Sequence, residues 1–150
     1  MNAVVTAGSG FLLAVLWFDL MHDVQVRGHT GPELPESVLA SIAGYYRRVT
    51  TEARPMNRLV ALSMLVTLAG LIAEAAGDAS PAWAVVVSLV AAVVPITLAA
   101  ARTVPSAVRL GRRDDPLEVQ SRLARRIHAD HWFCLAAITL VLVLQLGWVR

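Results

Sequence analysis

Residues 82–101 read AWAVVVSLVAAVVPITLAAA, twenty residues without one charged side chain. A helix of roughly 17 to 25 such residues is long enough to cross the hydrocarbon core of a membrane. Three further apolar runs have similar lengths: residues 3–21, 59–76 and 132–148. The four runs contain only two acidic residues, Asp19 and Glu74. Because 57% of the 150 residues are hydrophobic, the chain is too apolar for an ordinary soluble domain. The pattern predicts an all-α protein with four transmembrane helices.

The chain contains no lysine, and its arginines predict the orientation. Five arginines lie between the first and second runs and seven between the third and fourth, whereas residues 77–81 contain none. By the positive-inside rule, both arginine-bearing connections face the cytoplasm, and both termini lie outside. We therefore expect a multi-pass protein of the inner (plasma) membrane, with anionic lipid headgroups bound at the cytoplasmic arginines. Nucleic acid is not an expected partner, because the arginines lack the interleaved aromatic residues of a soluble nucleic-acid module.

A single domain of four helices is expected. Their predicted bounds are about residues 3–23, 56–76, 81–102 and 116–149. In the fourth, Asp115, Pro116 and Glu118 form a pattern typical of a capped helix start, and no breaker follows before Gly147. That helix should therefore extend several turns into the cytoplasm. Residues 1–10 carry no Lys or Arg, so the first run is expected to be a membrane helix and not a cleaved signal.

Residues 36–53, between the first two runs, have helical periodicity. Their apolar side chains share one face of about 120° at 100° per residue: Val38, Leu39, Ile42, Tyr45, Tyr46 and Val49. This pattern predicts an amphipathic helix on the cytoplasmic surface of the membrane, with the tyrosines at headgroup depth.

Small residues predict where the helices approach one another closely. They recur at every fourth position in two rows: Thr6, Gly10 and Ala14 in the first run, and Ala84, Ser88 and Ala92 in the third. Rows of this kind let helix backbones approach in lipid. We expect a compact bundle.

Polar side chains gather at the cytoplasmic ends of the helices. Asp19, His22 and Asp23 share one face of the first helix, and His128 and His131 share one face of the fourth. Carboxylate and imidazole groups projecting from several helices are typical of metal centres in four-helix bundles. The candidate metal ligands are Asp19, His22, Asp23, Glu52, His128 and His131.

The cofactor is left open by these residues. Iron or another transition metal is the first possibility, and a haem held by His22 and His131 is a weaker one. The alternative is a structural network, because polar residues are common at membrane interfaces and nearby arginines such as Arg125 and Arg126 can neutralise the carboxylates. Asp19 favours a specific role, because it lies inside an apolar run and would be costly in lipid without a partner.

Two other polar residues lie near the outer ends of the helices. Glu74 is expected to reach the outer interface beside Asp78, with a role in proton relay as the alternative. Gln145 on the fourth helix is expected to form an interhelical hydrogen bond.

In outline the chain resembles the small anthrone-oxygenase-like family of membrane proteins. The resemblance rests on four short helices, the loop expected at residues 103–110, and the segment RRIHADHW at residues 125–132. It implies a four-helix membrane fold and oxygenase activity. The segment WFDLMHD at residues 17–23 departs from the apolar segment of that family, and no catalytic residue is carried over.

Two functions are compatible with the sequence. The first is a non-catalytic subunit that binds protein partners, or a homo-oligomer, with a structural polar layer. The second is a metal-dependent membrane oxidoreductase acting on a lipid-soluble substrate. A channel or transporter is disfavoured, because the apolar runs contain little polarity.

Overall fold

The computed structural model describes residues 2–77 and 80–148, which are helical apart from short connections and contain no strand. As the sequence predicts, four helices are long and apolar enough to cross a membrane: Asn2–Val26, Pro55–Ala75, Ala82–Arg112 and Leu117–Gly147. In chain order the elements are α1 (Asn2–Asp23), η1 (Val24–Val26), α2 (Glu36–Arg47), η2 (Arg48–Glu52), α3 (Arg54–Ala75), α4 (Ala82–Leu98), η3 (Ala99–Thr103), α5 (Val104–Arg112) and α6 (Leu117–Gly147).

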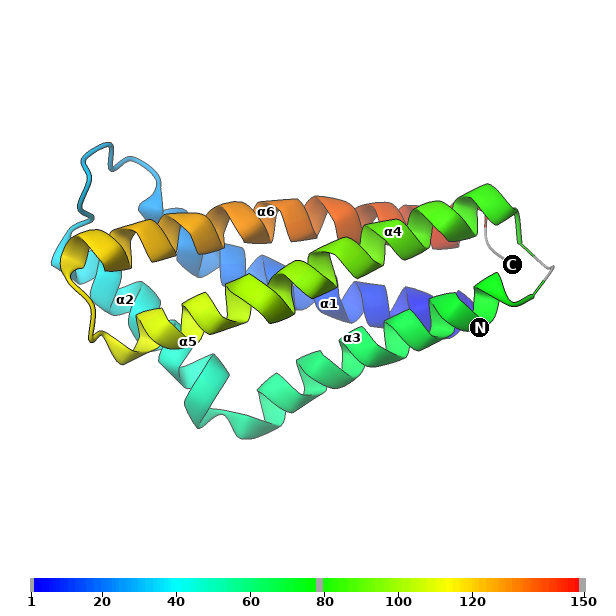
Figure 1. The fold of residues 1–150 in the computed structure, drawn as a ribbon, viewed down its shortest axis with the longest axis horizontal. Helices are drawn as coiled ribbons and strands as arrows, with labels where there is room; N and C mark the ends of the chain where they lie inside the picture. Colours follow the sequence, from blue (N-terminus) through cyan, green and yellow to red (C-terminus); the bar gives the residue numbers. More distant parts are fainter. Residues whose placement is uncertain (1, 78–79, 149–150) are drawn as a thin grey trace.

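The long helices run along one axis of an elongated bundle (Figure 1). α1 packs against α3 and α6, and α4 packs against the same two helices. Both chain termini lie at one end of the bundle, which we call the terminal end, and α2 and the α5–α6 connection lie at the other, the α2 end. Chain direction therefore brings the last residues of α1 and the first half of α6 to the α2 end.

The apolar face of α2 is buried against protein. Leu39 and Ile42 are fully buried, and they belong to a hydrophobic cluster that includes Leu110 of α5 and Ile127 of α6. The expectation that this face contacts the membrane surface is therefore wrong, whereas the depth of its tyrosines stays a prediction. An amphipathic pattern shows that a helix has an apolar face but does not show whether lipid or protein covers it.

The third membrane-length helix continues past residue 102, where the sequence predicted a loop at residues 103–110. Five π-helical residues (η3) lead directly into α5, with the amide of Val104 bonded to the carbonyl of Ala99. Pro105 lies directly after this π-helical segment, in the first turn of α5. The helix ends only at Arg113, whose φ of 62° is left-handed.

The fourth membrane-length helix begins without the predicted capping box. Pro116 is the N-cap residue of α6 and makes no side-chain cap hydrogen bond. The carboxylate of Asp115 instead accepts two hydrogen bonds from the guanidinium group of Arg109, at 2.7 and 2.8 Å. These bonds hold the pKa of Asp115 below its usual value. The helix ends at Gly147, and residue 149, where it was expected to end, lies outside the described residues.

Small residues determine two helix contacts. Ala84, Ser88 and Ala92 are fully buried, which confirms the row predicted on α4. In α1 the predicted row is wrong, since Ala14 is exposed and a Cβ atom at Gly10 would meet nothing within 4 Å. The close approach to α3 occurs instead at Gly8, where a Cβ atom would overlap the hydroxyl group of Thr67.

Candidate functional site

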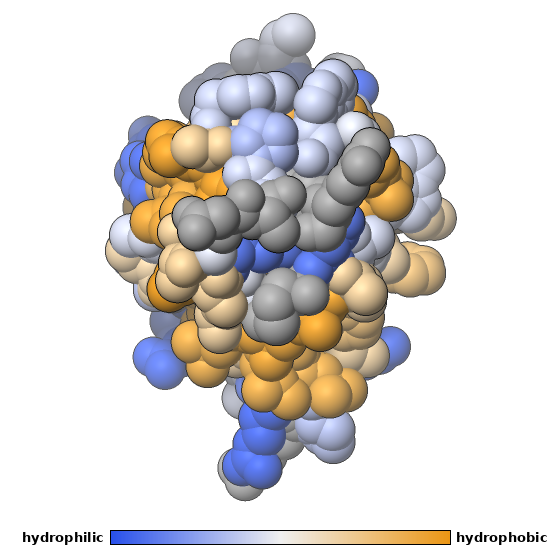
Figure 2. Space-filling model, turned by 90° about the vertical axis from the view of Figure 1, so that its right-hand side faces the viewer, coloured by the Kyte–Doolittle hydropathy of each residue, from blue (hydrophilic) through white to orange (hydrophobic). Residues whose placement is uncertain are grey.

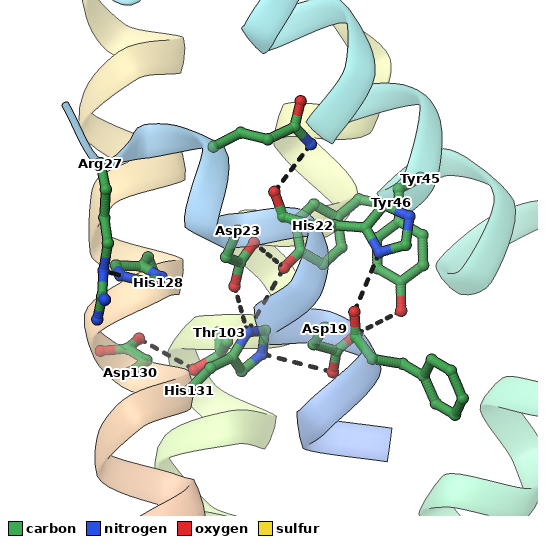
Figure 3. Close-up of polar contacts among 12 residues, drawn as sticks. Asp19, His22, Asp23, Arg27, Tyr45, Tyr46, Thr103, His128, Asp130 and His131 are labelled. Carbon is green, nitrogen blue, oxygen red and sulfur yellow. Dashed lines mark hydrogen bonds and ion pairs between the residues drawn. The ribbon is translucent and has the colours of Figure 1, made fainter. Parts of the chain in front are cut away.

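Five polar side chains from three helices meet at the α2 end of the bundle (Figure 3). The last two turns of α1 provide Asp19 and Asp23, α2 provides Tyr45 and Tyr46, and α6 provides His131. Asp19 and Asp23 are four residues apart, so they lie on the same face of α1. The buried apolar face of α2 turns the tyrosines toward that face of α1.

His131 is held in one orientation by Asp23. Its Nδ1–H group donates a hydrogen bond to Oδ2 of Asp23 at 2.7 Å, and the other oxygen of Asp23 accepts the hydroxyl hydrogen of Tyr46 at 2.5 Å. The side chain of Asp23 is fully buried, and only 9% of the His131 side chain is exposed. A carboxylate on Nδ1 leaves Nε2 as the basic nitrogen of the neutral ring.

The basic nitrogen of His131 faces a second carboxylate. Its Nε2 atom lies 3.8 Å from Oδ2 of Asp19, whose other oxygen accepts the hydroxyl hydrogen of Tyr45 at 2.7 Å. The ring of Tyr45 stacks on the ring of His22, with centroids 3.8 Å apart and an interplanar angle of 9°. When Nε2 takes up a proton, the imidazolium ring lies between two carboxylates that stabilise its charge.

Both tyrosines remain protonated in this environment. Burial raises the pKa of Tyr46 well above the ordinary value of 10.0, and the negative charge of Asp23 raises it further. Burial also raises the pKa of Tyr45, with a second contribution from Asp19. The tyrosines therefore act in this site as hydrogen-bond donors.

A second ion-pair network lies one residue away on α6. The buried carboxylate of Asp130 accepts hydrogen bonds from Nε and Nη2 of Arg102 and from the hydroxyl group of Thr103. Arg102 and Thr103 belong to η3, so the π-helical segment directs both side chains toward α6. π-Helical turns are rare and occur frequently at functional sites.

A pocket of about 610 Å³ opens beside His131. Its polar wall contains Asp19, His22, Tyr45, Tyr46 and His131, and both π-helical segments contribute to it through Thr50 and Thr103. The remaining wall is largely apolar and includes Phe11, Ala14, Val15, Phe18, Val49, Met56, Val60, Ala61, Met64, Ala100, Val104 and Ala107. A pocket of this volume, apolar with a few convergent polar groups, is typical of small-molecule sites.

Of the six predicted metal ligands, three are in contact with one another in this site and three are not. Asp19, Asp23 and His131 are in contact, and His22 lies beside them through Tyr45. His128 instead accepts a hydrogen bond from Arg27 at 3.3 Å. Glu52 is exposed and pairs with Arg47 at 3.1 Å, so it does not turn toward the bundle.

The described residues contain no group of three or more His, Cys, Asp or Glu side chains arranged to hold a metal ion. His22 bonds through Nδ1 to the carbonyl of Phe18 and His131 through Nδ1 to Asp23, an arrangement that is also common in metal-bound histidines. The metal and haem hypotheses therefore stay predictions. The described geometry shows a histidine held by Asp23 at the wall of a pocket.

Sequence reasoning missed Tyr45, Tyr46 and Thr103 as members of these networks. The two tyrosines are the only ones in the chain and are adjacent, which was a usable signal. They were assigned to the membrane surface because their spacing fits the apolar face of α2. Arg102 pairs with Asp130 in place of the expected Arg125, which donates to the carbonyl of Gly31.

Comparisons of the chain with protein-family models, with curated proteins and with solved structures found no match.

Proposed function

We propose that the chain is a membrane protein that binds a lipid-soluble molecule in the α2-end pocket and exchanges a proton with it through His131. The observation that carries this proposal is the orientation of His131, whose Nδ1 is bound to Asp23 while the ring lines an apolar pocket of about 610 Å³. An aspartate on Nδ1 fixes the tautomer in which Nε2 acts as a general base.

The chain's own residues define one chemical step. Nε2 of His131 takes a proton from a hydroxyl group or an acidic C–H group of the bound molecule, which becomes an anion. Asp19 and Asp23 stabilise the resulting imidazolium ring, and Tyr45 and Tyr46 hold the two carboxylates in place. Return of the proton to the same or another atom of the molecule regenerates neutral His131. The outline resemblance to anthrone-oxygenase-like proteins agrees with a lipid-soluble substrate of this kind.

The orientation that we propose follows from the arginines. The α2 end faces the cytoplasm, where its exposed arginines contact anionic headgroups of the plasma membrane. The pocket then lies at the depth of the inner leaflet, because it is lined by the last turns of α1 and the first turns of α3. A lipid-soluble molecule would reach it from that leaflet.

The test uses an alkyl nitrophenol, whose anion absorbs visible light and whose neutral form does not. Wild-type protein in lipid nanodiscs is expected to give a saturable increase in the anion's absorbance at neutral pH. His131→Gln should bind the probe without producing the anion. Ala61→Trp, which fills the pocket, should abolish binding, whereas Ala136→Trp in the separate groove between α4 and α6 should not. Equal anion formation by wild type and His131→Gln would refute the assignment.

A non-catalytic subunit is the second candidate, and the surface of α3 favours it. This helix has the smallest buried share of the four candidate spans, 17%, and it exposes Leu62, Leu65 and Ile72. A partner helix, or a second copy of the chain, would cover these residues. Crosslinking in native membranes through a cysteine at Leu65 tests this proposal. A specific adduct supports the function as a non-catalytic subunit. Absence of an adduct, with probe binding intact, supports the function as a small-molecule-binding protein.

A further inference from the structure

A second polar cluster lies at the terminal end of the bundle, far from His131. It consists of Asn2 and Thr6 on α1, Glu74 on α3 and Gln145 on α6. Figure 2 faces this end and shows hydrophilic surface near its centre, with hydrophobic surface around it. Glu74 is only 8% exposed and Gln145 is fully buried, so Glu74 does not extend to the interface as the sequence predicted. Asp78, its expected neighbour, lies outside the described residues.

Hydrogen bonds join the three helices at this cluster. The side-chain amide of Gln145 donates to Oε2 of Glu74 at 3.0 Å, which connects α6 to α3 and confirms the interhelical role predicted for Gln145. The side-chain amide of Asn2 donates to the main-chain carbonyl of Gln145 at 3.1 Å, and the hydroxyl group of Thr6 donates to Oδ1 of Asn2 at 2.8 Å. Glu74 and Gln145 are therefore fixed in position from both sides.

Two oxygen atoms of the cluster have no hydrogen-bond donor among the described residues. They are Oε1 of Glu74 and Oε1 of Gln145, and both are buried. No basic side chain of residues 2–77 or 80–148 forms an ion pair with Glu74. A buried carboxylate without an opposite charge is unfavourable, and so is a buried acceptor without a donor. A positive group bound at these oxygen atoms would offset both costs.

We propose that Glu74 and Gln145 bind one hard monovalent cation, such as Na⁺, at the terminal end of the bundle. Hard cations prefer carboxylate and amide oxygens, which are the two unpaired groups here. One carboxylate balances one positive charge, whereas divalent sites generally combine several carboxylates. The cation would link α3 to α6, and through Asn2 to α1, so its binding stabilises the assembled bundle.

The experiment measures thermal unfolding of the purified full chain in nanodiscs, with NaCl replaced stepwise by choline chloride at constant ionic strength. Because a ligand that binds only the folded state stabilises it, wild type should show a midpoint that rises and saturates with Na⁺. Glu74→Gln keeps the shape of the side chain without its charge, and it should weaken the apparent affinity by roughly tenfold or more. Glu118→Gln removes an exposed acid that pairs with Arg122 and should leave the Na⁺ response unchanged.

Three results would overturn the proposal. The first is a wild-type midpoint that is the same in NaCl and choline chloride. The second is an equal Na⁺ response in wild type and Glu74→Gln. The third is a midpoint that changes with pH and not with Na⁺, which would identify a bound proton in place of the cation. Should Glu74→Gln fail to fold, calorimetric titration of the wild type with NaCl decides alone, because absence of saturable heat would exclude the site.

Discussion

The hydroxyl group of Tyr46 donates a hydrogen bond of 2.5 Å to Oδ1 of Asp23, and this bond joins α2 to the last turn of α1. Tyr46 is 2% exposed and Asp23 is fully buried, so water cannot replace the bond. The second oxygen of Asp23 accepts the Nδ1–H group of His131 from α6. One buried carboxylate therefore connects three helices and orients the imidazole ring at the pocket wall.

Tyr46→Phe should lower the free energy of unfolding by about 1.5–3 kcal/mol, because it leaves a buried carboxylate oxygen without its donor. Denaturant titration in mixed micelles, followed by helical circular dichroism, measures this change. Tyr45→Phe is the matched control, since Tyr45 is half-buried and its loss should cost less. Equal stability of Tyr46→Phe and wild type would show that the bond to Asp23 contributes nothing.

Tyr45 and Tyr46 should ionise at higher pH than an ordinary tyrosine, whose titration is centred on pH 10.0. The chain contains two tyrosines, both in the site, so the ultraviolet absorbance of tyrosinate reports on the site alone. Because burial and the nearby carboxylates raise the pKa of Tyr45 and Tyr46, less than half of the tyrosine should be ionised at pH 10.0, the ordinary midpoint. Asp19→Asn removes the charge nearest Tyr45 and should move part of the titration toward that midpoint.

The same shifts predict how stability depends on pH. The folded state keeps both tyrosines protonated where the unfolded chain would release their protons. The contribution of the two tyrosines to the free energy of unfolding is therefore constant below pH 10.0. It decreases as the pH rises above 10.0 toward the raised pKa values of the folded state. The measurement is alkaline unfolding followed together with tyrosinate absorbance. If the tyrosines were half ionised at pH 10.0 and the chain unfolded at the same pH, the buried environment of the tyrosines would be contradicted.

Close packing of α1 on α3 should be sensitive to a single methyl group. A Cβ atom at Gly70 would lie 2.7 Å from Cγ2 of Val5, and one at Gly8 would overlap Thr67. Gly70→Ala and Gly8→Ala should each lower the free energy of unfolding by about 1–3 kcal/mol. Gly10→Ala is the control, because its methyl group would have nothing within 4 Å and helix propensity favours Ala by up to about 1 kcal/mol.

Gly8 and Gly10 show which features of the fold can be predicted from the sequence. The apolar runs predict four membrane-length helices, because length and hydropathy alone determine that feature. The contact face of α1 was misplaced, since spacing favours the row through Gly10, whereas Gly8 has the larger Val4 and Leu12 four residues away. Only the position of α3 identifies Gly8 as the contact. Helix pairing depends on tertiary packing, which the periodicity of one helix does not contain.

Only part of the candidate site was predicted, because the rest of it also depends on tertiary packing. Spacing along one helix placed Asp19 and Asp23 on one face, and topology brought His131 to the same end. The hydroxyl groups of Tyr45 and Tyr46 became partners only when the apolar face of α2 packed against α5 and α6. The resulting chain of donors and acceptors depends on that packing, and no local pattern reveals it.

The orientation predicted by the arginines can be tested with single cysteines, because the chain's only cysteine, Cys134, is buried. Ala76→Cys places a thiol at the terminal end and Ser37→Cys places one at the α2 end, both at exposed positions. A membrane-impermeant maleimide should label Ala76→Cys only in right-side-out membrane vesicles and Ser37→Cys only in inverted ones. Unsubstituted protein controls for reaction at Cys134. The reverse pattern would place the α2 end outside, and the pocket beside His131 would then open at the depth of the outer leaflet.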